Sequence, residues 1–425
     1  MYSYPPILHL FRTYEGLFSL KELTDEKRLL WMYGALQLFF LITFHKWVGS
    51  HFITKEYMEA GRYTCWPYFQ NCEGFYFLST LPEGYSQGLW YMIFFGFIVL
   101  GVYAAYRSWW VAAHFLLLIE WIWKTLVVFF ITLHNSGNYD YYHLLLGGIF
   151  LFLPHKLAFM RICFVLLYSL ASSVKFHEGW ILGTYFSSLK TGMPLFPQFL
   201  IPVFTNGLIL MEMLGSWFLF SKKRWIRYGV IGFFVFFHFY SGILVFYTYP
   251  CAVLPALLIL FGSKNIDFHI PRLDWHSISG WLLMIAMVLL QIGVNLIPGD
   301  VKMTLEGNQM AMYMFEANHQ CESISTIFYR DGTLSRRTNQ IISARFRCDP
   351  YRIWFQLKKQ CEKNHAIKNI SLQFDHSING GPFYRIVDEH DICNLSYSPF
   401  THNKWIRMPN EGAPIVGYPV KNIYY

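Results

Sequence analysis

The stretch ISGWLLMIAMVLLQIGVNLIP, residues 278–298, contains no Asp, Glu, Lys or Arg and decides the class of this protein. A helix needs about 20 mostly apolar residues to cross roughly 30 Å of hydrocarbon. Similar stretches precede it, and the sequence therefore predicts about nine membrane-spanning helices, at 29–49, 88–106, 109–133, 141–154, 162–174, 200–220, 226–248, 250–262 and 278–298. Three of them, at 141–154, 162–174 and 250–262, are short enough to be tilted, broken or re-entrant.

The composition agrees with a membrane protein. The 425 residues are 54% hydrophobic, 20% aromatic and 14% charged, whereas soluble domains carry roughly 25% charged residues. This excludes a disordered chain, a collagen, a coiled coil and an ordinary cytosolic enzyme. The net charge of +8 is modest for this length, so we predict no nucleic-acid partner. The sequence has no P-loop, GxGxxG, HExxH or CxxC motif, and we predict no metal.

The distribution of Lys and Arg predicts the orientation. Loops on the side of the N-terminus are richer in basic residues, with KKRWIR at 222–227 as the strongest run, which places the N-terminus in the cytoplasm. The chain then divides into a transmembrane domain, 1–298, and an extracytoplasmic domain, 299–425, in the ER lumen or the periplasm. Six cysteines fall on the outer side, which fits an oxidising compartment, and their pairing stays open: Cys65, Cys72, Cys321, Cys348, Cys361 and Cys393.

The outer domain has the pattern of a small α+β fold. SISTIFYRDGTLS (323–335) predicts two strands around an Asp-Gly turn. PYRIWFQLKKQCEKN (350–364) predicts an amphipathic helix. ISLQFDHSINGGPFYRIVD (370–388) predicts a hairpin with Asn-Gly-Gly at its tip.

Ionisable residues inside apolar stretches are costly, so each is a hypothesis of function. Glu120 and Lys124 lie four apart on one helix face and form either a self-neutralising structural pair or part of a site. Asn138, Asp140 and His143 cluster at the outer end of the fourth stretch. They cap the helix that begins there, or they contribute to a site.

Three further residues extend the list. Lys175 ends the fifth stretch; it snorkels to the interface, or it acts as a base because an apolar wall penalises its cation. Glu212 lies within the sixth stretch and needs a partner or a proton, and His238 lies among phenylalanines in the seventh. His238 is either a satisfied core histidine or a hydrogen-bond donor to a carbonyl or quinol oxygen. The aromatic excess reflects core packing or a pocket for a flat apolar ring.

These residues occur in segments that resemble a known family. SSVKFHEGW and the LFP that follows it (172–197) resemble the active-site segment of the vitamin K-dependent γ-glutamyl carboxylase family. FFHFYSGILVF (236–246) resembles the family's membrane histidine segment. FYRDG (328–332), FQLKKQC (355–361) and the ING…PF…SPF…W pattern (378–405) resemble its post-membrane domain.

The resemblance implies roles for individual residues. Lys175 falls on the family's catalytic lysine and His238 on its functional histidine. Asp140 stands at the position of a further family histidine, unless His143 replaces it. The resemblance also implies a disulfide between the first outer loop and the outer domain, and contacts with the cofactor: Cys65–Cys361 for the disulfide, and Asn138, Tyr142 and Glu212 for the cofactor.

The implied activity is that of a carbon–carbon lyase. Neutral Lys175 would remove a proton from vitamin K hydroquinone, dioxygen would yield an epoxide and a strong base, and that base would abstract a γ proton from glutamate before CO2 adds. The implied partners are a peptide or protein substrate docking on the outer domain, and membrane lipid. The family's substrate-binding segment corresponds to GNQMAMYMFEANHQ (307–320), which keeps only Tyr313 of its Tyr-Ser-Trp pattern. The alternatives are therefore a divergent member that abstracts a proton from another quinone or lipid, and a non-catalytic membrane binding protein.

Overall fold

The computed structural model describes most of the chain, and its described residues divide into two compact units. We call these the helical unit (Met1–Met58, Cys72–Ser169 and Met211–Ala286) and the sheet unit (Glu59–Asn71, Leu170–Leu210 and Met287–Tyr425). The described residues are 13–49, 63–78, 86–131, 133, 137–189, 192–244, 247–266, 268–298, 301–313, 316–342, 348–407 and 418–419.

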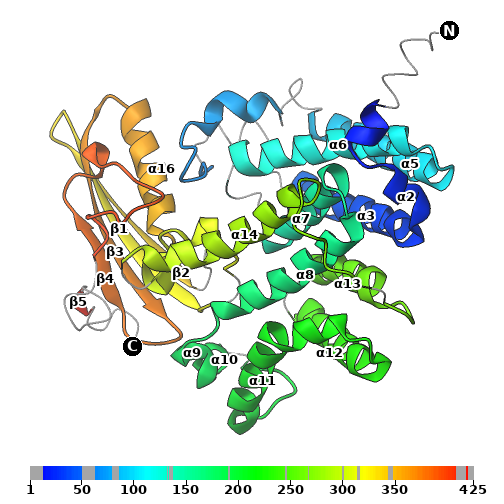
Figure 1. Ribbon diagram of the computed structural model, residues 1–425. Coiled ribbons are helices and arrows are strands. Elements are labelled where there is room, and N and C mark those ends of the chain that lie inside the picture. The colour runs from blue at the N-terminus through cyan, green and yellow to red at the C-terminus, as the bar shows by residue number, and fades with distance from the viewer. Residues whose placement is uncertain are drawn as a thin grey trace. The chain divides into compact units, whose positions relative to one another are not determined.

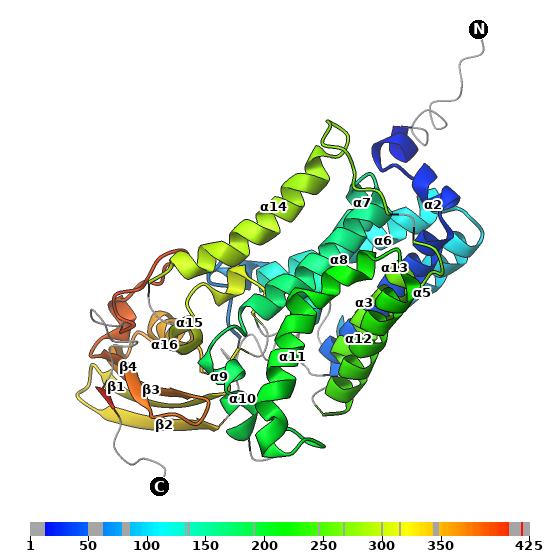
Figure 2. The ribbon, with the colours of Figure 1, turned by 60° about the horizontal axis from the view of Figure 1, so that its bottom comes forward.

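Long apolar helices make up the helical unit, and α12 and α13 run side by side in it (Figure 2). Three of its helices, α8, α11 and α14, continue into segments assigned to the sheet unit. The elements are α2 (Lys21–Asp25), α3 (Lys27–Gly49), η1 (Cys72–Leu78), α5 (Ser86–Tyr106), α6 (Trp110–Leu126), the π-helical turn η2 (Val127–Ile131), α7 (Asn138–Phe152), α8 (Lys156–Ser173), α11 (Ile201–Met213), η5 (Gly215–Phe220), α12 (Arg224–Leu244), α13 (Thr248–Phe261) and α14 (Ile278–Gly293).

The prediction of nine spans is supported only in part. Each predicted stretch contains a helix, but among the described residues four helices are long and apolar enough to cross a membrane: Trp110–Phe130, Lys156–Ser173, Arg224–Leu244 and Ile278–Leu296. Shorter apolar helices lie at Tyr91–Tyr106, Gln198–Met213 and Thr248–Phe261. A 14-residue helix such as α13 rises only about 21 Å, which is less than the thickness of the hydrocarbon core. Among the described residues, helix length thus supports four of the nine predicted spans.

The sheet unit is built around an antiparallel sheet with the strand order β2-β1-β3-β4-β5. Helix α16 lies alongside this sheet (Figure 1). The elements are α9 (Glu178–Ile181), α10 (Thr184–Ser187), η4 (Gln198–Leu200), η6 (Val294–Leu296), α15 (Val301–Thr304), η7 (Asn308–Met310), β1 (His319–Tyr329), β2 (Leu334–Ile342), α16 (Pro350–Lys363), β3 (Ile367–Ile378), β4 (Tyr384–Glu389), η9 (Ile392–Asn394) and β5 (Tyr418–Pro419).

The predicted hairpins and helix of the outer domain are confirmed. Between β1 and β2, the Asp331 carboxylate accepts hydrogen bonds from Thr333 and Gly332 takes a φ of 88°, a conformation that glycine adopts without strain. Between β3 and β4, Asn379 and Gly380 have φ values of 53° and 70°, as a tight turn requires. The turn residues therefore identified both strand pairs from sequence.

The sheet unit includes more of the chain than the predicted domain 299–425. Part of the first loop packs on α16, where the Tyr351 hydroxyl donates to the Cys65 carbonyl at 2.8 Å and the Tyr63 and Phe355 ring centroids are 5.8 Å apart. In the segment after α8, Ser188 Oγ lies 3.0 Å from the Asn318 side-chain nitrogen. Because of these contacts, segments outside 299–425 belong to the sheet unit.

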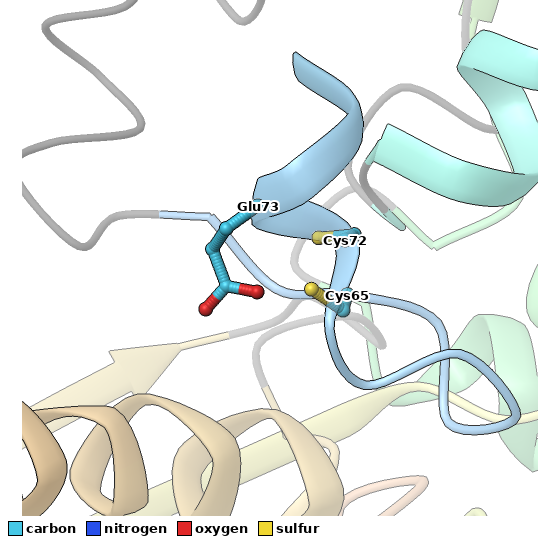
Figure 3. Close-up of side chains that lie close together, drawn as sticks. All are labelled: Cys65, Cys72 and Glu73. Carbon is cyan, nitrogen blue, oxygen red and sulfur yellow. The ribbon is translucent and has the colours of Figure 1, made fainter.

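The disulfide implied by the resemblance, Cys65–Cys361, is wrong, because Cys361 has another partner. Cys361 pairs with Cys393, and a second disulfide joins Cys321 to Cys348. Cys65 and Cys72 are themselves disulfide-bonded and lie close together beside Glu73 (Figure 3). Oxidised sulfurs do not bind a metal, so this trio is a structural feature. The first loop is held on α16 by packing, which the spacing of cysteines could not reveal.

Peptide mapping tests this disulfide pattern directly. Under non-reducing digestion, we expect Cys361 to be recovered in a peptide linked to Cys393, and Cys321 in one linked to Cys348, as the structure pairs them. Mass spectrometry before and after reduction measures this. Recovery of a Cys65–Cys361 peptide from folded protein would contradict the pattern.

Acid should destabilise the sheet unit through His376. Burial, and then the neighbouring His319, lower the pKa of His376 from 6.5 to about 3. Below about pH 6.5 the His376 imidazole is therefore protonated in the unfolded chain but still neutral in the folded chain. The free energy of unfolding falls as the pH drops towards 3. At about pH 5 the loss is about 2 kcal/mol. Thermal unfolding should show a weaker pH dependence in His376→Gln, while His365→Gln, at an exposed position, should behave like the wild type.

Candidate functional site

Lys175 lies in a turn after α8 and is 2% exposed. Its Nζ is 5.1 Å from the centroid of the Trp180 ring, and Trp180 stacks on Tyr185 with centroids 4.9 Å apart. A lysine nitrogen over the face of an aromatic ring makes a cation–π contact, and the burial of the side chain keeps bulk water away from it. The arrangement therefore holds the Lys175 amine in a water-poor site against an aromatic wall.

His177 fixes the turn that carries Lys175. Its Nδ1 accepts a hydrogen bond from Gly179 N at 3.1 Å and so caps α9. Because Nδ1 is an acceptor, the ring proton is assigned to Nε2, which donates to the Glu316 carbonyl at 2.6 Å. One local and one long-range hydrogen bond thus fix the turn that follows Lys175.

The residue before Lys175 packs on the segment that follows α14. Val174 contacts a small core cluster that includes Val294, Ala311 and Tyr313. Gln291 ties the same elements together, since its Oε1 accepts from Met312 N at 2.8 Å. Tyr313, the one residue retained from the family's substrate-binding pattern, is thus in the same cluster as the neighbour of Lys175.

A second cluster lies inside the helical unit around His238, which is fully buried on α12. The Tyr168 hydroxyl of α8 forms a hydrogen bond with His238 Nε2. The Tyr249 hydroxyl of α13 donates to the Tyr142 hydroxyl of α7 at 3.1 Å, and the Tyr249 and His238 rings lie 5.5 Å apart. The Glu212 carboxylate interacts electrostatically with all three hydroxyls.

This tyrosine–histidine cluster brings together three residues proposed from sequence, Tyr142, Glu212 and His238, and adds Tyr168 and Tyr249. The sequence contained a signal for both additions, because a tyrosine hydroxyl within a long apolar run needs a hydrogen-bond partner. The two hydrogen-bonded pairs, Tyr168–His238 and Tyr249–Tyr142, place hydroxyls and an imidazole that can hold a phenolic oxygen.

A third cluster lies at the start of α7. The Lys124 ammonium forms an ion pair with the Asp140 carboxylate at 2.8 Å and donates to Thr43 Oγ1 at 3.0 Å. Asp140 also accepts from Gly137 N at 2.8 Å, so it caps the helix as well as pairing with the lysine. The structure thus gives Lys124 a partner on another helix, beyond the Glu120 pair considered from sequence.

His143 and Asn138 differ in their surroundings. His143 is 1% exposed, and within the described residues neither ring nitrogen has a hydrogen-bond partner. Its ring lies 5.4 Å from that of Phe39. Asn138 is half-buried at the first position of α7. Asp140 and His143 are the two candidates for the histidine position of the carboxylase resemblance. Asp140 is ion-paired with Lys124, whereas both ring nitrogens of His143 lack a hydrogen bond among the described residues.

The predicted site residues are divided between the two units. Lys175 belongs to the sheet unit. The others belong to the helical unit: Asn138, Asp140, Tyr142, His143, Glu212 and His238.

Comparison with known proteins adds no relative. No family model, no curated protein and no solved structure matches the chain. The resemblance to the carboxylase family therefore rests on the sequence segments that carry it.

Proposed function

We propose that this chain is an integral membrane enzyme that couples oxygenation of a quinol to carboxylation of a glutamate side chain, with Lys175 as the base. The observation that carries the proposal is the buried Lys175 amine on the Trp180 ring. A quinol hydroxyl is a weak acid, so its base must be neutral, and a lysine is neutral near pH 7 only where its cation is poorly solvated.

The residues around Lys175 fit a flat phenolic ring. Trp180 and Tyr185 stack to form an extended aromatic wall, and a quinol can pack against such a surface. When bound, vitamin K hydroquinone with dioxygen would supply the strong base that removes the γ proton, and CO2 would then add. Lys175 takes one proton from a hydroxyl and becomes an ammonium, and the low exposure of its site keeps out water that would quench a strong base.

Within the helical unit, the tyrosine–histidine cluster would by itself offer hydrogen bonds to a phenolic or carbonyl oxygen. His238 and Tyr168 already share a hydrogen bond, and the Tyr142 hydroxyl accepts from Tyr249. The imidazole and the tyrosine hydroxyls can each donate a hydrogen bond to a carbonyl oxygen or accept one from a hydroxyl. We assign Glu212 to orienting these hydroxyls by its charge.

The proposal includes a membrane topology. The N-terminus lies in the cytoplasm, the KKRWIR run stays on that side, and the shorter helices complete nine crossings where the bilayer thins around them or neighbouring helices cover their ends. The sheet of the sheet unit is extracytoplasmic and docks the peptide or protein substrate.

A second candidate function has one observation in its favour. Of the family's Tyr-Ser-Trp pattern, residues 307–320 keep only Tyr313, and its side chain is 5% exposed within the core cluster. A buried tyrosine contacts a glutamate substrate poorly. The same lysine would then abstract a proton from a quinol or another lipid ring without carboxylating a peptide.

One assay separates these candidates. Purified protein in detergent is given vitamin K hydroquinone, dioxygen, labelled CO2 and a Glu-containing peptide, and both epoxide and peptide label are measured. The carboxylase predicts both products, and the second candidate predicts epoxide alone. Absence of both products from folded protein would overturn the role of Lys175 in quinol chemistry.

A further inference from the structure

A pocket of about 980 Å³ opens beside the start of α6. Exposed polar residues, Glu15, Lys21 and Thr24, line part of it, together with Tyr14 and Trp110. Water can therefore reach this end of α6 although the rest of the helix has a buried face.

A buried histidine connects this pocket to the interior. His114 is completely buried, its Nε2 lies 3.0 Å from the Leu151 carbonyl and its Nδ1 lies 2.7 Å from the Tyr14 hydroxyl. A carbonyl only accepts, so Nε2 carries the proton and Nδ1 accepts from Tyr14. A side chain that lines the pocket thus hydrogen-bonds to a titratable group inside the helical unit.

Polar side chains of α3 lie beside α6. The Tyr33 hydroxyl donates to the Ala113 carbonyl at 3.0 Å, and the Gln37 amide nitrogen donates to the Tyr33 hydroxyl at 3.1 Å. Gln37 Oε1 faces no hydrogen-bond partner among the described residues. Its amide is close enough to interact with the Glu120 carboxylate, although outside hydrogen-bond geometry.

Glu120 is the central member of this series. It is completely buried, and neither carboxylate oxygen has a hydrogen-bond partner within the described part of the chain. A buried carboxyl group in an apolar helix bundle is stable only when it is hydrated or carries a proton. Lys124, one turn further on, forms the ion pair with Asp140 and interacts electrostatically with His143.

We propose that these groups form a proton pathway along α6, from the pocket to the Lys124–Asp140 pair. Along the helix axis, Glu120 lies about 9 Å beyond His114 and Lys124 about 6 Å beyond Glu120, so the proposal requires water molecules between the side chains. Glu120 takes up one proton from the pocket side and passes it to the Asp140 carboxylate, and Asp140 then releases it at the start of α7, so that both carboxyl groups return to their starting states while Lys124 keeps its charge. Tyr33 and Gln37 position the water between carriers.

This function is independent of the proposed carboxylase activity. In the proposed topology α6 runs from the cytoplasmic to the outer side, so the pathway delivers protons to, or removes them from, the outer end of the helical unit. Glu120 and Lys124 then have a role beyond neutralising each other.

The test is proton flux into lipid vesicles. Full-length protein is reconstituted with a pH-sensitive dye inside, a pH gradient is imposed and the membrane potential is clamped with potassium and valinomycin. We expect the gradient to relax faster than in protein-free vesicles. Glu120→Gln, which removes a proton carrier while preserving shape, should slow the protein-dependent flux by about 10²-fold, whereas Glu26→Gln, at a partly exposed ion pair, should not.

Two further results decide the proposal. Gln37→Leu keeps side-chain volume but removes the group that positions water, and it should also slow the flux; it replaces Glu120→Gln if that variant fails to fold. Infrared spectroscopy should detect a carboxyl group whose signal Glu120→Gln removes. Equal flux in wild type and in either folded variant, or no flux above that of protein-free vesicles, overturns the pathway.

Discussion

Lys175→Met should reduce hydroquinone oxidation by about 10²–10⁴-fold, the usual contribution of a positioned base. The methionine retains an unbranched apolar stem that can pack against Trp180, while the amine that takes up the proton is lost. Because the fold loses little, the thermal unfolding temperature should change far less than the activity. Epoxide formation under saturating hydroquinone and dioxygen measures the effect.

The Lys175→Arg variant makes this prediction sharper. A guanidinium keeps the positive charge and stacks on an aromatic ring, but it stays protonated at any pH that proteins tolerate. If Lys175 acts as a base, Arg should be as inactive as Met. Lys368→Met, at an exposed position on β3, is the matched control and should retain full activity. An active Lys175→Arg enzyme would mean that the lysine only supplies charge or packing.

The elements that the sequence predicted well are those set by local chemistry. Asp331-Gly332 and Asn379-Gly380 specify their own turns, and α16 follows from Asp349, whose carboxylate accepts from Tyr351 N at the helix start. Such signals involve residues a few positions apart. The two turns and the helix start therefore form without contacts to distant parts of the chain.

Long-range pairing was beyond the reach of sequence. Lys124 was matched with Glu120 because the two lie on one helix face, yet its ion pair is with Asp140 on another helix. Cys361 was matched with Cys65 by family resemblance, yet it bonds to Cys393. In both cases several partners satisfied the local pattern, and only tertiary packing chose between them.

In the candidate site, too, the sequence indicated single residues but not how they come together. The sequence identified His238, Glu212 and Tyr142 separately, since an ionisable or functional group in an apolar stretch stands out. Their assembly through Tyr168 and Tyr249 depends on how five helices pack, which periodicity does not specify.

Asp140→Asn should destabilise the helical unit by about 3–5 kcal/mol, because it leaves the Lys124 ammonium buried without its counter-charge. Both partners of the pair are almost fully buried, and the Thr43 hydroxyl alone cannot replace a carboxylate. Asparagine can still accept the hydrogen bond from Gly137 N, so the loss reports on the ion pair and not on the helix cap. Thermal or denaturant unfolding in detergent measures it.

The control for this variant is Asp274→Asn. Asp274 also accepts a backbone hydrogen bond, from Ser277 N at 2.9 Å, but it is exposed, and asparagine keeps that bond at little cost. The double variant Asp140→Asn with Lys124→Met should recover much of the lost stability, since replacing both partners removes the uncompensated charge. If Asp140→Asn alone unfolds like the wild type, Lys124 is neutral in the folded protein and the pair is not an ion pair.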